Sequence, residues 1–416
     1  MIQKIKSQAE MLAKLGIKGL NPMQKEVQQV LKTSEDTILL SPTGSGKTLA
    51  FLLPIIESID PECKEIQVLI IVPSRELALQ IEQVVRELGS GYKANAIYGG
   101  RAGAKDKIDL QHPPAILIGT PGRISDHIER ESFAVKSIKT LVLDEFDKSL
   151  EIGFEKEMKA IVWELPQVRR KILTSATEPK SIPEFIGLRD PFYINYLDEK
   201  INKLTIKVIK SPDKDKLETL GQLIQKLEGQ PGIVFCNFKD SIERVSEYLN
   251  KHKINHGCFF GGLEQKDRER ALIKFRNGSY HLLLATDLAS RGLDIPEMKF
   301  IIHYHLPIKE EEFTHRNGRT ARMHQSGIAY VLDGAEEKLP HFIEPDYISV
   351  QEIDNTNTNA IEFQTLFISG GRKDKISKGD IAGLFMKEGK LQKEDIGVIE
   401  LKSDCAFVAV NSGKAK

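Results

Sequence analysis

Several features that would narrow the class of this protein are scarce in its sequence. The 416 residues include four cysteines and one tryptophan, and 59 basic residues balance 59 acidic ones. The cysteines have no CxxC spacing, so we expect neither a zinc site nor a disulfide framework. We interpret them as buried thiols in a reducing compartment. They are Cys63, Cys236, Cys258 and Cys405.

Long apolar runs are also missing. The N-terminal "MIQKIKSQAEMLAKLGIKG" has helical periodicity interrupted by charges and lacks the apolar core of a signal peptide. No uncharged apolar stretch reaches the roughly 18 residues of a membrane span, so we expect a cytoplasmic protein with no membrane partner. Because the net charge is zero, a nucleic-acid partner would have to be held by a local basic groove.

Short apolar runs alternate with helical segments through most of the chain. The first series is "TILL", "VLIIVP", "AILIGT", "TLVLDE" and "KILTSAT", and the second is "TIKVIK", "GIVFCNF", "HGCFF", "HLLLATD", "FIIHYHLP" and "GIAYVL". This alternation predicts parallel sheets built from βαβ units. We therefore expect two α/β domains, at residues 1–197 and 203–352.

A third, smaller segment follows. Residues 353–361 belong to a polar stretch without apolar periodicity, which predicts a linker. Residues 362–416 have the pattern strand, helix, strand, strand. We expect a small α+β module near the lower size limit for independent folding.

The stretch "ILLSPTGSGKT" ends a predicted strand in a glycine-rich loop, and a predicted helix follows. Gly44 and Gly46 would let backbone N–H groups approach phosphates, Lys47 would add a positive charge, and Thr48 would offer a hydroxyl to Mg²⁺. Thr43 and Ser45 complete the ATP-binding loop. The alternative is a chance glycine loop, but the flanking strand and helix favour the phosphate site.

A second strand delivers carboxylates in "LVLDEFDKSLEIGF". Burying Asp144, Glu145 and Asp147 together is costly unless their charges have partners. We assign Asp144 to Mg²⁺, and Glu145 to orienting and deprotonating the attacking water.

Read in order, the motifs resemble the series of DEAD-box RNA helicases. They are "NPMQKEVQ", "SPTGSGKT", "PSRELALQ", "YGG", "TPGR", "LDEFD", "SAT", "IVFCNF", "LEQKDRERALIKFRNG", "ATDLASRGLDIP" and "HRNGRTAR". The resemblance implies two RecA-like domains and ATP hydrolysis coupled to RNA unwinding, with ATP and Mg²⁺.

Phe146 stands where the family has alanine. We expect its ring to point away from the metal and to pack against helix residues such as Leu150.

The resemblance also assigns roles within the ATP site. Gln24 matches the glutamine that reads the adenine edge, and because no aromatic residue precedes it, we expect an aliphatic side chain to replace base stacking. Further nucleotide contacts are Gly292 and Asp294, the interdomain link is Asp147, Ser175 and Thr177, and the arginine fingers are Arg319 and Arg322. Solvated helix charge is the alternative for the two arginines.

Glycines and hydroxyls at strand ends suit contacts with a sugar–phosphate backbone, although each could instead be a plain turn or cap residue. The RNA-binding candidates are Pro73, Ser74, Arg75, Gly99, Gly100, Thr120, Pro121, Gly122 and Arg123 in the first domain, and Asn237, Gln265, Arg268 and Thr286 in the second.

Three histidines could suggest other chemistry. We expect His315 to structure its loop, and His303 and His305 to alternate on a strand without binding a metal.

The stretch "ISGGRKDKISKGDIAGLF" resembles the start of the RNA-binding domain of DbpA-type helicases, an RRM-like module that directs them to a hairpin of large-subunit ribosomal RNA. Ala321 agrees with that subfamily. Arg372, Lys373 and Lys375 would contact RNA, and a solvated charged turn is the alternative. The chain stops at "FVAVNSGKAK", before a second helix and fourth strand, so we expect an exposed sheet edge.

These patterns predict a monomeric RNA helicase whose partner is RNA, including 23S ribosomal RNA or pre-ribosomal particles in large-subunit assembly. A DNA helicase, and an RNA clamp that does not unwind, remain alternatives. An unrelated P-loop ATPase would not explain "TPGR" and "HRNGRTAR" together.

Overall fold

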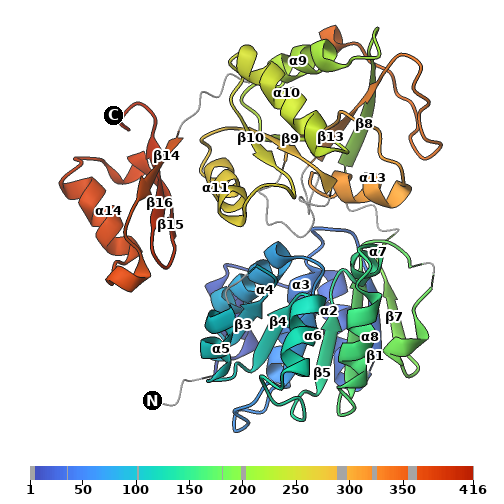
Figure 1. Ribbon diagram of the computed structural model, residues 1–416, viewed down its shortest axis with the longest axis vertical. Coiled ribbons are helices and arrows are strands. Elements are labelled where there is room, and N and C mark those ends of the chain that lie inside the picture. Colours follow the sequence, from blue (N-terminus) through green and yellow to red (C-terminus); the bar gives the residue numbers. More distant parts are fainter. Residues whose placement is uncertain are drawn as a thin grey trace. The chain divides into compact units, whose positions relative to one another are not determined.

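The computed structural model divides into two compact units, residues 1–200 together with 291–294, and residues 201–290 together with 295–416. It describes residues 5–34, 36–100, 103–179, 181–197, 203–287, 298–320, 326–354 and 363–415. Three sheets are visible in the ribbon (Figure 1), one in the first unit and two in the second.

The sheet of the first unit has seven parallel strands. Every residue is buried in four of its five inner strands, and in the fifth all but the first two are, as expected for a parallel sheet covered by helices on both faces. In spatial order the strands are β3 (Ala94–Ile97), β4 (Ile116–Gly119), β2 (Val68–Ile71), β5 (Thr140–Leu143), β6 (Arg170–Ser175), β1 (Asp36–Leu40) and β7 (Phe192–Asn195).

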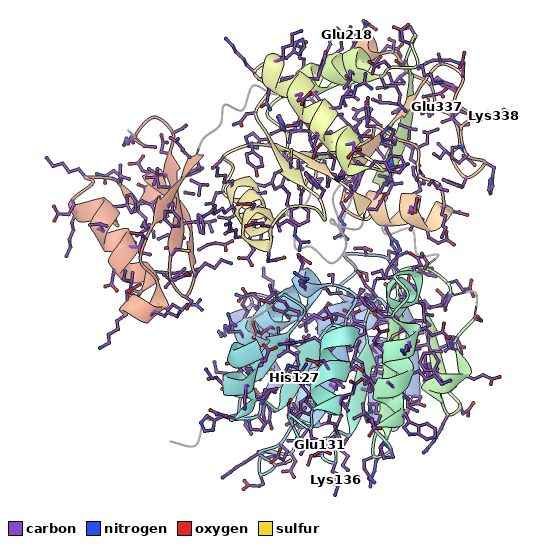
Figure 2. The ribbon with its side chains drawn as sticks, in the orientation of Figure 1. His127, Glu131, Lys136, Glu218, Glu337 and Lys338 are labelled. Carbon is purple, nitrogen blue, oxygen red and sulfur yellow. The ribbon has the colours of Figure 1, made fainter. Side chains whose placement is uncertain are left out.

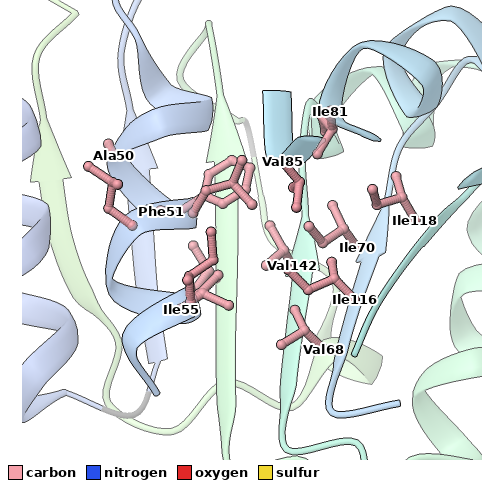
Figure 3. Packing of buried hydrophobic residues seen from close by; sticks show 14 of the residues in the cluster. Ala50, Phe51, Ile55, Val68, Ile70, Ile81, Val85, Ile116, Ile118 and Val142 are labelled. Carbon is pink, nitrogen blue, oxygen red and sulfur yellow. The ribbon is translucent and has the colours of Figure 1, made fainter. Parts of the chain in front are cut away.

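Alternating side chains divide the core of this unit between the two faces of the sheet. Figure 3 shows Phe51 and Ile55 of one helix and Val85 of another packed over Val68 and Val142 of the sheet. The helices are α1 (Gln8–Lys14), α2 (Pro22–Thr33), α3 (Lys47–Glu57), α4 (Arg75–Leu88), α5 (Gly103–Leu110), α6 (Pro121–Glu129), α7 (Phe146–Glu151) and α8 (Glu155–Trp163), with the 3-10 turn η1 (Glu184–Ile186).

The second unit begins with a parallel six-stranded sheet. In spatial order its strands are β10 (His256–Phe259), β11 (Leu282–Ala285), β9 (Gly232–Phe235), β12 (Phe300–His303), β13 (Ser326–Asp333) and β8 (Lys203–Lys210). Its helices are α9 (Leu217–Lys226), α10 (Lys239–Lys251), α11 (Gln265–Arg276) and α13 (Glu310–Asn317), with η2 (Val350–Glu352).

The C-terminal module is an antiparallel sheet of three strands with one α-helix, in the predicted order strand, helix, strand, strand. Its elements are β14 (Phe363–Ile368), η3 (Arg372–Asp374), α14 (Lys378–Lys387), η4 (Lys393–Asp395), β15 (Ile396–Leu401) and β16 (Ala406–Asn411). Within the described residues β14 and β15 each pair with β16 alone. Most of the predicted linker, 353–361, lies outside the described residues.

Two expectations need correction. The apolar runs did not predict β3 and β7, the edge strands of the first sheet. The strand β7 is four residues long, and three of its side chains are exposed, so it lacks the buried apolar run of the inner strands. Only Cys236 is a buried thiol, whereas the other three cysteines are partly exposed.

In the part of the chain that is described, every helix is too short or too polar to cross a bilayer.

Candidate active site

The phosphate-binding loop lies between β1 and α3, as predicted. Gly44 and Gly46 have φ angles of 82° and 89°, in the left-handed region that favours glycine. A Cβ on Gly46 would lie 2.6 Å from Nε2 of Gln24. The loop therefore needs glycine at position 46 for both its backbone angle and its close neighbour.

Polar groups of the loop suit a phosphate. The buried Lys47 ammonium donates hydrogen bonds to the carbonyl oxygens of Ser41 and, at 3.0 Å, Pro42, which hold it over the loop. The hydroxyls of Ser41 and Ser45 are buried and have no hydrogen-bond partner among the described residues. Buried hydroxyls without partners are uncommon in folded proteins, and these two could donate to phosphate oxygens.

Asp144 and Glu145 follow β5 at the same edge of the sheet. Burial raises the pKa of the Asp144 carboxyl, while a hydrogen bond from the Thr174 hydroxyl and the charge of Lys47 lower it. Glu145 has a φ of 48°, an uncommon angle for a residue with a side chain. Such backbone strain is concentrated at functional sites.

The oxygen donors at this edge are of the kind that Mg²⁺ prefers. The carboxylate of Asp144 and the hydroxyl of Thr48, on the first turn of α3, are hard ligands. Burial raises the pKa of Asp144, and a bound cation would favour the charged form of its carboxylate. These residues fit a magnesium ion bound with phosphate.

The predicted interdomain link is a connected group within the first unit. The Thr177 hydroxyl donates to Oδ2 of Asp147 at 2.8 Å, and its backbone N–H donates to Oγ of Ser175 at 3.0 Å. The backbone N–H of Ser41 donates to the Ser175 carbonyl at 3.0 Å. The group is thus one hydrogen bond away from the phosphate-binding loop.

Phe146 is 1% exposed and belongs to the core cluster against which Leu150 packs, which confirms the predicted packing of its ring. Its neighbour Lys148, which was not among the predicted residues, is a buried lysine whose Nζ lies 2.8 Å from Oε1 of Glu151. Thr174 was not predicted either, although it stands directly before Ser175 in "TSAT".

Gln24 lies beside the loop, where the assigned adenine contact requires it. Its backbone N–H donates to Oδ1 of Asn21 at 2.8 Å, and its Oε1 accepts from the Asn21 N–H at 3.0 Å, so the two form a capping box. Its Nε2 donates to the Gly46 carbonyl at 3.3 Å. Asn21 also donates to the Ser45 carbonyl. This glutamine therefore couples the start of α2 to the loop.

The RNA-binding candidates of the first unit follow β2, β3 and β4. Ser74 caps α4 by accepting the N–H of Leu77 at 3.2 Å, and a Cβ on Gly100 would lie 2.6 Å from the Arg75 guanidinium. Arg123 bonds the carboxylates of Asp106 and Asp126. Pro73 and Gly99 adjoin these residues, and Thr120, Pro121 and Gly122 begin α6.

In the second unit Asn237 belongs to a partly buried network, centred on Arg316, that the sequence did not reveal. Its Oδ1 accepts from Arg316 at 2.8 Å, and Arg316 bonds both carboxylate oxygens of Asp287. The Arg316 side chain is 1% exposed. Asn237 also donates its backbone N–H to Nδ1 of His305 at 3.2 Å. This network fixes the loop after β9.

The other candidates of the second unit also follow its strands. Gln265 accepts a hydrogen bond from Arg268 at the start of α11, and the N–H of Thr286, after β11, donates to the Phe259 carbonyl. Arg319 is buried just after α13. Gly292, Asp294 and Arg322 lie outside the described residues.

The three histidines at and beyond the end of β12 are held by protein contacts. Burial and the charge of Arg316 lower the pKa of His303 to about 3, and its Nε2 lies 3.0 Å from Oδ1 of Asn317. Burial and the charge of Lys216 lower the pKa of His305 to about 4. His315 is buried on α13.

The basic candidates of the C-terminal module stand on a turn held by its backbone. The N–H groups of Arg372 and Lys373 donate to the carbonyls of Lys402 and Ser403 at 3.0 and 2.8 Å. Their side chains and that of Lys375 are exposed and make no ion pair with a described carboxylate. This leaves three cations free to meet a phosphate backbone.

Three family models match separate parts of the chain. Residues 21–185 match the DEAD/DEAH box helicase model, 215–324 match the helicase conserved C-terminal domain, and 365–416 match the DbpA RNA binding domain. The matches account for each of the three sheets.

Similar sequences and solved structures belong to the same class of protein as the family models. The ATP-dependent RNA helicase DbpA of Escherichia coli is 32% identical over 97% of this chain and 91% of its own length. The Bacillus subtilis protein of that name is 29% identical over 96% and 91%. S. cerevisiae Dbp5 bound to RNA and ADP BeF3 has a TM-score of 0.73 at 23% identity, covering 83% of this chain and 95% of that one.

The structure of Mss116p bound to ssRNA and AMP-PNP has a TM-score of 0.69 at 24% identity, over 78% of this chain and 71% of that one. At these identities the two structures show the fold alone, which is a tandem of RecA-like domains. The sequence relatives and the family models show the family to which the chain belongs. The chain belongs to the DEAD-box family of ATP-dependent RNA helicases, of the DbpA type with a C-terminal RNA-binding domain.

Proposed function

We propose that this protein hydrolyses ATP to separate short RNA duplexes locally. One observation carries the proposal: the phosphate-binding loop, the acids after β5 and the Ser175–Thr177 link meet at one edge of a sheet and are joined by hydrogen bonds. Because the ATPase site is hydrogen-bonded to the Ser175–Thr177 segment, a change of bound nucleotide can shift the conformation of that segment and of the residues it contacts.

In this proposal the loop N–H groups and Lys47 bind the ATP phosphates, and Glu145 orients the attacking water and accepts its proton. Asp144 and Thr48 would hold Mg²⁺, which neutralises charge on the phosphates. Gln24 would contact the adenine edge.

Arg319, Arg322, Gly292 and Asp294 would supply the remaining ATP contacts. Arginine fingers of this type contribute roughly 10³ to 10⁵ in rate. Because Arg319 belongs to the second unit, hydrolysis would require the two units to come together on ATP and RNA.

The decisive experiment measures ATPase activity with RNA and with DNA of the same sequence. We expect stimulation by RNA and its loss in Arg319→Ala, whereas Arg270→Ala, an exposed arginine of the same unit, keeps it. Full stimulation in Arg319→Ala would refute the proposal. Stronger stimulation by DNA would support a DNA helicase, and ATP-dependent RNA retention without strand separation would support a clamp.

We further propose that the protein acts in assembly of the large ribosomal subunit. The support is the match of residues 365–416 to the DbpA RNA binding domain, together with the exposed Arg372, Lys373 and Lys375. Crosslinking in cells followed by RNA sequencing tests it. Enrichment of 23S ribosomal RNA is expected, and its absence would remove the assignment.

A further inference from the structure

A basic pocket lies at the amino ends of the strands in the first unit, the sheet edge opposite the ATP site. It has a volume of about 490 Å³. Strands of four to six residues separate the two edges by roughly 15–20 Å. Figure 2 shows Lys136 at this end of the unit. The cations that line the pocket are Lys136, Lys139, Arg169 and Arg170.

The backbone fixes two of these cations side by side. Lys139 directly precedes β5 and Arg169 directly precedes β6, and the Arg169 N–H donates to the Lys139 carbonyl at 3.0 Å. The Lys139 N–H donates to the carbonyl of Gln67, just before β2. Gln67, Lys139 and Arg169 therefore stand in a row at the starts of three adjacent strands, and backbone hydrogen bonds set the spacing between them.

The opposite wall of the pocket is also rigid. The buried Gln67 side chain accepts the Asp60 N–H at 2.9 Å and donates to the carbonyls of Asp60 and Cys63. These bonds use both ends of its amide to hold the loop after α3. The pocket is a preformed hollow.

Little negative charge balances the cations. Asp60 is the one carboxylate that lines the pocket, and Lys136, Lys139 and Arg169 make no ion pair with any described residue. Like charges opposite each other on paired strands are unfavourable, and Lys139 and Arg169 stand at the starts of the paired strands β5 and β6. An anionic ligand would offset the repulsion between these two cations.

We propose that this pocket binds the phosphate backbone of RNA outside the strand held at the ATP-site edge. The three cations without ion pairs are exposed, so they can reach the phosphates of an extended chain, whose backbone is bound by such contacts without regard to sequence. The inference rests on the proposed RNA-dependent function and adds a contact that holds structured RNA without reading its sequence.

The test uses the full chain with Lys136→Gln, Lys139→Gln and Arg169→Gln combined. The matched control combines Lys32→Gln, Lys156→Gln and Lys159→Gln, three exposed lysines of the same unit. Affinity for a long structured RNA and for a short single strand is measured against salt. The slope of log affinity against log salt is negative, and we expect it to become less steep by roughly 2 to 3 for the long RNA in the pocket variant.

Affinity for the short strand, and the ATPase activity it stimulates, should be unchanged. An equal change of slope in the control, or no change in the pocket variant, would overturn the proposal. So would competition by inorganic pyrophosphate at constant ionic strength, which would assign the pocket to a small phosphorylated ligand. Because the cations repel one another, the melting temperature of the pocket variant should not fall, and a lower value would also count against the proposal. If the short strand fails to stimulate the unmodified protein, the proposed function fails instead.

Discussion

The hydroxyl of Thr174 joins Asp144 to its neighbour in the acidic motif. It donates to Oδ1 of Asp144 and accepts the backbone N–H of Glu145 at 3.3 Å. One side chain on β6 therefore orients both the expected metal ligand and the residue expected to position water.

Replacing Thr174 by valine keeps the shape of the side chain and removes these bonds. The Thr174 hydroxyl lowers the pKa of Asp144 and orients its carboxylate, and losing such a partner of a metal ligand costs roughly 10- to 100-fold in metal affinity. We therefore expect the Mg²⁺ concentration for half-maximal ATPase activity to rise about tenfold or more. Thr174→Ser keeps the hydroxyl and should stay close to the unmodified protein. Equal Mg²⁺ dependence in both variants would contradict the role of the hydroxyl.

Phe146→Ala tests whether the ring among the acids serves packing. The side chain is almost fully buried in the core beneath α7, and truncating such a ring costs roughly 3 kcal/mol. We expect a lower midpoint in urea unfolding and ATPase activity within a few-fold at low temperature. A folded variant with a large catalytic loss would show that the ring shapes the site.

Gly46→Ala should abolish nucleotide binding. The new Cβ would need the left-handed backbone and would meet Nε2 of Gln24 at 2.6 Å. Titration with a fluorescent ATP analogue measures the effect. Gly383→Ala is the control, since it lies within α14, has nothing within 4 Å of the added Cβ, and should leave affinity unchanged.

The stability of the second unit should fall as the solution becomes acidic. In the unfolded chain His303 has a pKa of about 6.5, whereas in the folded unit its pKa is about 3. Between these values the unfolded state binds more protons, so the free energy of unfolding decreases with falling pH, by up to about 1.4 kcal/mol per pH unit.

Urea unfolding at several pH values, with His303→Leu as the comparison, checks this expectation. The variant lacks the titrating group, so its stability should change less steeply between about pH 6.5 and pH 4. Identical slopes would show that His303 does not contribute to the acid sensitivity.

The sequence predicted the parallel strands and the edge that carries the ATP site, because buried strands are continuous apolar runs and glycine loops have a recognisable pattern. It did not predict β7, whose side chains are mostly exposed at a sheet edge. Local patterns also could not reveal Arg316, because its partners Asn237 and Asp287 are distant in the chain. The same holds for Lys139 and Arg169, which the sheet alone brings together.

The left-handed backbone at Glu145 has a consequence for protein engineering. Non-glycine residues in that conformation cost about 1–3 kcal/mol, which glycine would largely avoid. A library selected only for heat resistance should therefore enrich Glu145→Gly and recover robust but inactive proteins. A screen that scores turnover at every round would keep the acid, and thermostable versions of this enzyme would have to gain their stability at other positions.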